Sequence, residues 1–228
     1  MSAYRTLALA AILVTSACLK ANAQQSGAVI FMATEKAVQK NFSLIYDTLT
    51  IAPHERVADI GDQGGNIMPV LDYKYDSLDV TLEDISSQWL NPVRVDSVTA
   101  YYNRLFGKIS TNRYSVVIGN DSSTTLPDAY FDKIFFVNTY HECSQKDKMV
   151  RELNRICAPG GLVILVEVVS KKAGKTRNDC HHIMPTNAEI QRMFKANGFS
   201  QVAVYYRNPK KSHTVVTYRF RKNREVNK

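Results

Sequence analysis

The sequence of 228 residues is poor in the features that mark several special classes of protein. Four cysteines, ten glycines and seven prolines are too few for a dense disulfide framework, a collagen-like repeat or a low-complexity chain. The long apolar run lies near the N-terminus, at residues 7–14, and is too short to cross a bilayer as a helix. With 45% apolar and 22% charged residues, the composition favours one globular α/β domain with a sizeable core.

Positive charge is distributed unevenly along the chain. The formal net charge is +8, from 29 Lys and Arg against 21 Asp and Glu. Residues 207–228 hold eight basic residues and one acidic residue, whereas residues 24–206 hold 19 basic and 20 acidic residues. A basic tail can contact nucleic-acid phosphates in a salt-dependent way, which is one hypothesis for the function. A solvated terminal run of charge is the commoner case, so we do not expect a nucleic-acid partner.

The first 23 residues have the pattern of a secretory signal peptide. A single arginine precedes the apolar run, and the small-x-small sequence ANA at residues 21–23 stands directly before Gln24. We therefore expect residues 1–23 to be removed and the protein to be exported, periplasmic or secreted, with no transmembrane segment in the mature chain. An anchoring helix that stays attached is the alternative. Lipid anchoring at Cys18 is a weaker one, because Thr15 stands where a lipobox usually has leucine.

Cleavage at this site leaves three cysteines, Cys143, Cys157 and Cys180. An odd number does not form a complete disulfide framework, and three separate thiols are the simpler expectation for a domain of this size. If one bridge forms in an oxidising compartment, Cys143 and Cys180 are the pair to test.

Hydrophobic periodicity predicts alternating strands and helices, followed by a final pair of strands. The predicted strands cover residues 56–60, 78–82, 114–118, 133–137, 162–168, 201–206 and 213–220. The predicted helices cover residues 33–49, 64–73, 95–106, 145–156 and 187–196. Alternation indicates right-handed crossovers and parallel pairing, while the short final connection requires the last two strands to pair antiparallel. The predicted fold class is α/β: one Rossmann-like, doubly wound, mostly parallel seven-stranded sheet with an antiparallel C-terminal hairpin.

Polar residues and glycines follow the first three predicted strands. The first strand runs into the glycine-rich sequence DIGDQGG at residues 59–65, whose glycines let a ligand approach the backbone. The second runs into Asp84, about twenty residues further on, where a carboxylate can accept both hydroxyls of a ribose. Asn120 and Asp121 follow the third strand, where they would meet an adenine edge. Together these positions predict a nucleoside ligand across the switch point of the sheet.

The glycine-rich turn is not the dinucleotide-binding fingerprint. Its glycines at residues 61 and 64 do not satisfy the pattern G-x-G-x-x-G. In addition, Asp59 at the end of the strand would repel a pyrophosphate and attract an ammonium group. A dehydrogenase therefore shares the predicted fold class but not the predicted site.

Four ordered motifs make the chain similar to class I S-adenosylmethionine-dependent methyltransferases. They are DIGDQGG at residues 59–65, LEDI at 82–85, LPDAYFD at 126–132 and RELNRICAPGG at 151–161. The resemblance covers about residues 50–206, and four motifs in order are much more specific than one. It implies S-adenosyl-L-methionine as the cofactor. Together with the signal-peptide pattern, it divides the chain into a signal peptide (1–23), an N-terminal helical segment (24–50) and a class I methyltransferase-like domain with a basic C-terminal tail (51–228).

The resemblance further implies which residues hold the cofactor: the glycine-rich loop at the methionine end, the acidic pair at the ribose, and the pair after the third strand at the adenine. With the first residue after the fourth strand, these are Asp59, Gly61, Gln63, Gly65, Glu83, Asp84, Asn120, Asp121 and Asn138. The structural alternatives are a tight strand-to-helix turn with a helix-capping acid for Asp59 and Gly61, and a turn-forming acid for Asp121. Only one of Glu83 and Asp84 is expected to face the ligand, because neighbouring side chains of a strand alternate.

The segment after the fourth strand, NTYHE at residues 138–142, is where the resemblance places the wall between cofactor and acceptor. His141 is our candidate for a general base because histidine titrates near neutral pH, and Tyr140 and Glu142 are the alternates. A hydrogen-bonded structural histidine is an equally simple role for His141. No metal is expected, because the cysteines and histidines of residues 141–182 fit no standard ligand spacing.

The resemblance implies transfer of a methyl group from S-adenosylmethionine to an acceptor, which we expect to be a small molecule. The sequence identifies neither the acceptor nor the oligomeric state. One residue departs from the family pattern D/E-x-G-x-G-x-G, because Gln63 replaces the central glycine and would narrow the cofactor pocket. Export would also separate the protein from a cofactor that is made in the cytosol. The alternative hypothesis is therefore an exported, non-catalytic binding protein built on a degenerate methyltransferase fold.

Overall fold

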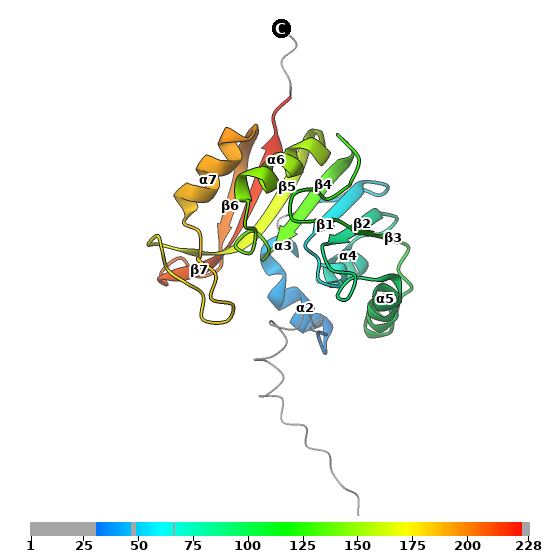
Figure 1. The fold of residues 1–228 in the computed structure, drawn as a ribbon. Helices are drawn as coiled ribbons and strands as arrows, with labels where there is room; N and C mark the ends of the chain where they lie inside the picture. Colours follow the sequence, from blue (N-terminus) through cyan, green and yellow to red (C-terminus); the bar gives the residue numbers. More distant parts are fainter. Residues whose placement is uncertain (1–30, 47–48, 66, 225–228) are drawn as a thin grey trace, which may run out of the picture.

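The computed structural model describes residues 31–46, 49–65 and 67–224. Its centre is a seven-stranded sheet in the order β3-β2-β1-β4-β5-β7-β6 (Figure 1). The strands are β1 Arg56–Ile60, β2 Asp79–Asp84, β3 Arg113–Ile118, β4 Phe131–Val137, β5 Cys157–Ser170, β6 Phe199–Tyr206 and β7 His213–Lys222. The seven predicted strands are therefore confirmed, each within a few residues of its predicted ends.

Strand pairing confirms the predicted fold class. The first five strands pair in parallel, and β7 pairs antiparallel with both β5 and β6. The chain moves outward from β1 to β3 and then returns to place β4 beside β1, so the switch point lies between β1 and β4. The carboxyl ends of these two strands therefore border the crevice in which doubly wound sheets bind ligands.

Helices cover both faces of the sheet (Figure 1). They are α2 Glu35–Asn41, α3 Ser43–Tyr46, α4 Met68–Lys74, α5 Pro92–Phe106, α6 Lys146–Ile156 and α7 Asn187–Ala196. Alternate residues of a strand face opposite sides of the sheet. Val57 and Phe135 accordingly join the core that contains Val38 of α2 and residues of α4 and α5. Ala58 and Ile134 join the core on the other face, with α6 and α7.

Two helical segments differ from the prediction. The expected helix at residues 33–49 is interrupted at Phe42. The side chain of Asn41 donates to the carbonyl oxygen of Ala37 at 2.8 Å and so competes with the backbone hydrogen bonds of the helix. Helix α4 begins at Met68 instead of residue 64, because Gln63 and the two glycines after it have positive φ values. Between β3 and β4 the described chain forms no helix, as the sequence pattern also indicated.

The described residues contain no helix of the length and apolarity that a membrane span requires. The three cysteines Cys143, Cys157 and Cys180 are free thiols, so the bridge considered between the first and the last of them is not formed. The predicted signal peptide lies outside the described residues.

Candidate active site

A cavity of about 380 Å³ opens at the carboxyl ends of the first four strands, a volume within the usual range of small-ligand sites. Six residues that the sequence predicted to bind the cofactor line it: Gly61, Gln63, Glu83, Asp84, Asn120 and Asp121. Other parts of the wall come from Ile85, Ser86, Trp89 and Met149. The predicted residues thus converge on one site, although they come from the ends of three separate strands.

Hydrogen bonds between backbone amides and carboxylates hold the glycine-rich loop after β1. The N–H of Gln63 donates to Asp84 Oδ2 at 3.0 Å. The carboxylate of Asp62 accepts the N–H of Gly64 at 3.2 Å and that of Gly65, which is buried behind the cavity wall. Gln63 has a φ of 51°, in the left-handed region where glycine is the usual residue. The loop therefore keeps the backbone course of a glycine-rich turn despite the substitution.

Gly61 marks a close approach between the loops that follow β1 and β4. A Cβ atom at this position would lie 2.3 Å from Thr139 Cγ2. The Thr139 hydroxyl donates to the carbonyl oxygen of Gly61 at 3.3 Å. The structural reason for this glycine is thus contact with a neighbouring loop, and the same contact places both residues in the cavity wall.

Four buried carboxylates gather at this edge of the sheet. The exposed fractions are 2% for Asp59, 1% for Asp62, 3% for Glu83 and 6% for Asp84. Burial and the neighbouring carboxylates raise the pKa of Asp59 well above its ordinary value, and burial together with Asp84 raises the pKa of Glu83 to about 8. Among the described residues Asp59 Oδ2 has no hydrogen-bond partner. A cation at this edge would relieve the repulsion, whereas a pyrophosphate would add to it.

Both acidic residues at the end of β2 line the cavity, although we expected only one to face it. Asp84 points toward the glycine-rich loop and also accepts the N–H of Ser86 at 2.8 Å. Glu83 lies toward the end of β3, where a Cβ atom on Gly119 would be 2.0 Å from Glu83 Oε1. The two side chains therefore approach the cavity from different directions.

The pair after β3 divides its roles differently from the prediction. Asn120 Oδ1 accepts the N–H groups of Ser122 and Ser123, each at 3.0 Å, so Asn120 is the residue that forms the turn. Asp121 is exposed and lines the cavity. Of this pair, Asp121 is thus the side chain whose oxygens remain open to a ligand.

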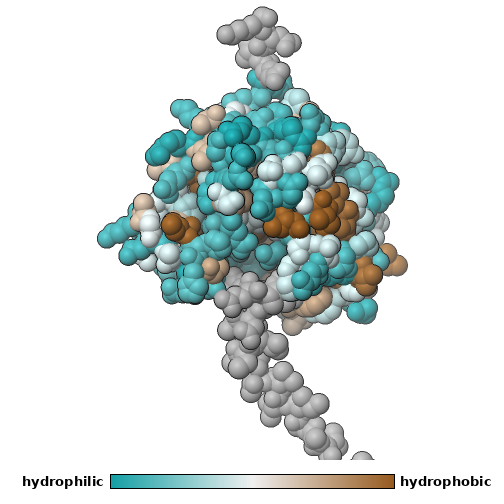
Figure 2. Space-filling view, viewed as in Figure 1, coloured by the Kyte–Doolittle hydropathy of each residue, from teal (hydrophilic) through white to brown (hydrophobic). Residues whose placement is uncertain are grey.

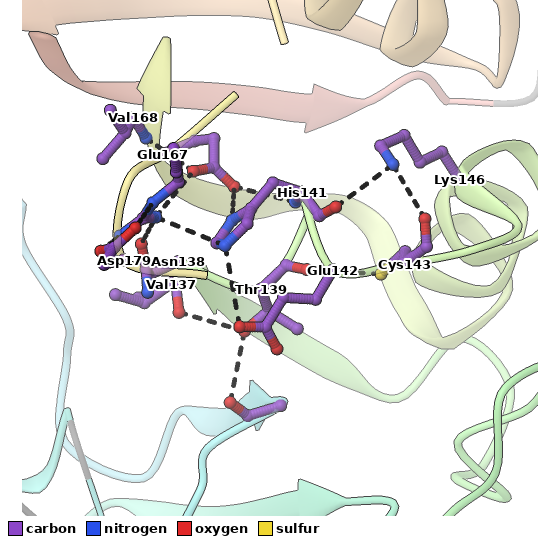
Figure 3. A network of polar contacts seen from close by, with 12 residues as sticks. Val137, Asn138, Thr139, His141, Glu142, Cys143, Lys146, Glu167, Val168 and Asp179 are labelled. Atoms are coloured by element: carbon purple, nitrogen blue, oxygen red, sulfur yellow. Dashed lines mark hydrogen bonds and ion pairs between the residues drawn. The ribbon is translucent and has the colours of Figure 1, made fainter. Parts of the chain in front are cut away.

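The three candidate bases after β4 point in three directions. Tyr140 is 2% exposed and packs against Phe194, away from the cavity. His141 is also 2% exposed, and its Nδ1 lies 3.0 Å from Glu167 Oε2 (Figure 3). Glu142 lines the cavity, and burial raises the pKa of its carboxyl. Only Glu142 therefore reaches the cavity directly.

A buried polar network stands behind Glu142 (Figure 3). Glu167 Oε2 accepts the backbone N–H of His141 at 3.0 Å as well as contacting its ring. His141 Nε2 lies 3.7 Å from Glu142 Oε1 and 3.4 Å from Arg177 Nη1. Arg177 also donates to Asn138 Oδ1, so Asn138 belongs to this network and not to the cavity wall. The imidazole is thus held between carboxylates on both of its nitrogens.

Sequence reasoning missed Glu167 and Arg177. Glu167 is 1% exposed inside the most apolar strand of the chain. A charged residue in such a strand is the signal that could have marked it, because buried charges need partners. Arg177 lies in the long connection after β5, where no local pattern indicates a contact with β4. Within the described part of the chain, no cluster of three or more His, Cys, Asp or Glu side chains is arranged to hold a metal ion.

Comparison with known proteins agrees with this geometry. Residues 58–165 match the family model described as "Methyltransferase domain". No curated protein matches the sequence. Among solved structures, an S-adenosylmethionine-dependent methyltransferase from Aquifex aeolicus is 18% identical, with a TM-score of 0.57 over 82% of this chain and 88% of the other.

Two further structures are similar in fold. Phosphoethanolamine N-methyltransferase 2 from Haemonchus contortus, solved with S-adenosyl-L-methionine, is 15% identical, with a TM-score of 0.62 over 82% of this chain and 53% of the other. The [4+2]-cyclase SpnF is 17% identical, with a TM-score of 0.65 over 83% and 82%. The strand order, the glycine-rich loop and the matched residues lead to one assignment: residues 58–165 match a methyltransferase domain, in a chain with the fold of the class I S-adenosylmethionine-dependent methyltransferases.

Proposed function

We propose that the protein is an S-adenosylmethionine-dependent methyltransferase that acts on a small-molecule acceptor. The observation that carries the proposal is the cavity at the switch point, where a glycine-rich loop meets buried carboxylates. S-Adenosylmethionine joins an adenosine to an ammonium and a sulfonium group. When bound, it supplies a methyl group that leaves sulfur, with the electron pair kept by sulfur, as the bond to the acceptor forms.

The residues of the cavity fit the separate parts of this cofactor. Each carboxylate oxygen of Asp84 accepts one N–H, which leaves lone pairs for the two ribose hydroxyls. Ile85 and Met149 offer apolar surface to a base, and Asp121 offers oxygens to its edge. Behind the cavity wall, the buried Asp59, whose Oδ2 has no partner among the described residues, and the carboxylates around it favour a cationic methionine end.

The protein's part in methyl transfer is to align the two reactants, to exclude water and, for some acceptors, to take a proton. Glu142 is placed to take it, because its carboxylate lines the cavity and its pKa is raised by burial. His141 lies 3.7 Å behind this carboxylate, and Glu167 fixes the direction of the imidazole ring. Glu142 is therefore our candidate base, and His141 is a positioning residue that can share the proton.

The fold alone does not decide between reactions, since one structure of the same fold is named as a [4+2]-cyclase. The proposal therefore rests on binding and transfer, which are measured separately. We expect S-adenosylmethionine and S-adenosylhomocysteine to bind in isothermal titration calorimetry, and NAD not to bind. Absence of binding by both adenosyl compounds would contradict the proposal.

Two matched variants test whether the adenosyl compounds bind in this cavity. Asp84→Asn removes a charge at the ribose position, whereas Asp79→Asn makes the same change at the other end of β2. Loss of a hydrogen bond to a charged group weakens binding by about ten- to a hundredfold. We expect this loss for Asp84→Asn alone, with cooperative thermal unfolding showing that both variants are folded.

Transfer is tested with a donor labelled in its methyl group and the low-molecular-weight fraction of a cell extract. We expect label to appear in a compound of that fraction other than the donor. Little of this label should appear when Glu142→Gln replaces the unmodified protein. Glu35→Gln, an exposed change on α2, is the control. Binding of the donor without any transfer of label would instead favour the non-catalytic alternative.

A further inference from the structure

We propose that a second cavity binds an acidic group of the methyl acceptor, so that the acceptor is a small organic molecule carrying a carboxylate or a phosphate. This inference rests on the proposed function and names its substrate class. The cavity has a volume of about 630 Å³. It lies between the loop that follows β5 and the start of β7, beside the network that contains His141.

The fold brings together basic segments that are distant in sequence. Ser170 at the end of β5 pairs with His213 at the start of β7. The N–H of Lys171 donates to the carbonyl oxygen of Ser212 at 3.0 Å, and its Nζ donates to that of Lys210 at 3.3 Å. The β5–α7 loop and the β6–β7 turn thus form one surface, and the visible face around them is mainly hydrophilic (Figure 2).

The wall of this cavity is positively charged. Four basic residues and one acidic residue line it: Lys171, Lys172, Lys175, Arg177 and Asp179. Arg177 donates to both carboxylate oxygens of Asp179, at 2.9 and 2.5 Å, and so compensates the one negative charge. None of the ion pairs among the described residues includes Lys172 or Lys175. Two amino groups at the wall therefore remain available to an acidic ligand.

Apolar side chains complete the cavity and favour a small organic acid over an extended polyanion. Val168 and Met184 form part of the wall beside the lysines. A polynucleotide would instead need a continuous basic face along the hairpin. Arg221 and Lys222 do not extend this face, because they lie at the opposite end of β7.

Arg177 connects this cavity to the cofactor cavity. Arg177 lines the second cavity, and its Nη1 lies 3.4 Å from His141 Nε2. That same nitrogen is 3.7 Å from Glu142, which lines the first cavity. Arg177 and His141 thus link the walls of the two cavities. An acid held by the lysines of this wall would lie beside the side chains that lead through Arg177 and His141 to the candidate base.

The anion site is tested by calorimetry at low ionic strength, with pyrophosphate and succinate as probes. The double variant Lys172→Gln/Lys175→Gln removes the two available charges. Lys36→Gln/Lys148→Gln removes two exposed charges elsewhere and keeps the same net charge. We expect the first double variant to bind the probes at least tenfold more weakly, with control binding unchanged and donor binding equal in both. Equal losses in both variants, or no binding of either probe, would overturn the proposal.

The class of acceptor is tested on the labelled product itself. We expect the methylated product to be retained by an anion-exchange resin at neutral pH, and its yield to fall in the first double variant only. A product that passes through the resin would overturn the inference while leaving methyl transfer established. Tighter binding of an oligonucleotide than of pyrophosphate would overturn it too. Probe binding without donor binding would show that the proposed function had failed and would remove the acceptor assignment.

Discussion

Gln63 shows at the scale of one residue how a family pattern can change while its backbone is retained. The loop keeps a left-handed residue at this position, with φ at 51°, and keeps the N–H bond to Asp84. For a residue with a Cβ atom, this left-handed backbone conformation costs about 1–2 kcal/mol. The same side chain lines the cofactor cavity. The substitution therefore has two separable effects, one on stability and one on the space for a ligand.

We predict that Gln63→Gly raises the free energy of unfolding by up to about 1 kcal/mol, because relief of the left-handed strain exceeds the added freedom of the unfolded chain. It should also tighten donor binding, since the side chain leaves the cavity wall. Gln63→Ala is the control that removes the side chain but keeps the strain. Urea unfolding and calorimetry measure the two effects. A glycine variant less stable than the alanine variant would contradict the prediction.

Glu83 gives stability a dependence on pH. Burial and Asp84 raise its folded-state pKa to about 8, so between about pH 5 and 8 the folded protein keeps a proton that the unfolded chain has released. The free energy of unfolding must then fall as pH rises through this range, by at most about 1.4 kcal/mol per pH unit for one group. Asp59 acts in the same direction, because its pKa is also raised.

We therefore predict that Glu83→Gln flattens this decline between pH 6 and pH 8, as measured by urea unfolding at several pH values. The glutamine retains the size of the side chain and cannot ionise. Glu35→Gln, at an exposed position, should leave the slope unchanged. An identical slope in Glu83→Gln and the unmodified protein would show that this carboxyl is not the source.

At the scale of elements, the site depends on the meeting of two loops from strands that are adjacent in space only. β1 and β4 pair directly although about seventy residues separate them along the chain, a long-range contact typical of doubly wound sheets. The contact between Gly61 and Thr139 holds the loops together at the point where both enter the cavity wall. This contact, and not ligand approach alone, explains the glycine.

We predict that Gly61→Ala lowers the free energy of unfolding by about 2–4 kcal/mol, from left-handed strain together with the clash against Thr139. Gly107→Ala is a matched control, because Gly107 has a φ of 62° and nothing lies within 4 Å of its added Cβ. Its loss should be confined to the strain. Adding Thr139→Ala to Gly61→Ala should recover part of the stability in a double-mutant cycle. Strictly additive losses would contradict the proposed contact.

At the scale of the whole molecule, basic residues of the C-terminal segment bind backbone carbonyl groups in distant parts of the fold. Arg207 donates to the carbonyl oxygens of Lys40 and Asn41, at 3.0 and 2.6 Å, where α2 ends. Lys222 donates to carbonyl oxygens at the end of α6, at 2.7 and 2.8 Å. Positive charge is favourable at both places because carbonyl groups are unpaired at helix C-termini. The segment therefore serves the fold at its two ends.

We also propose that the protein is exported and loses residues 1–23. Packing within the described chain begins later, with the Phe31 ring 4.6 Å from the ring of Tyr101, so cleavage before Gln24 removes none of the described contacts. Mass spectrometry of protein recovered from the producing cells should find Gln24 as the first residue. An intact leader would contradict this prediction, and a lipid on Cys18 would replace it with the anchored alternative.

Local patterns in the sequence by themselves determined the strands, most helices and the position of the glycine-rich turn. Helix α7 illustrates this, because its predicted extent is its observed one and Thr186 and Glu189 form a capping box at its start. Such features depend on residues within a few positions of one another, so periodicity and capping residues are enough to predict them. The resemblance added the order in which the polar loops meet.

Only the tertiary structure decided which side chains reach a cavity. It placed Glu142 in the wall, Tyr140 in the core and His141 against Glu167. It also joined the lysines after β5 to the β6–β7 turn. These contacts link residues that are separated by twenty or more positions, and they arise from strand order and loop course. A local pattern carries no information about such contacts, because the same local conformation can pack against different distant segments.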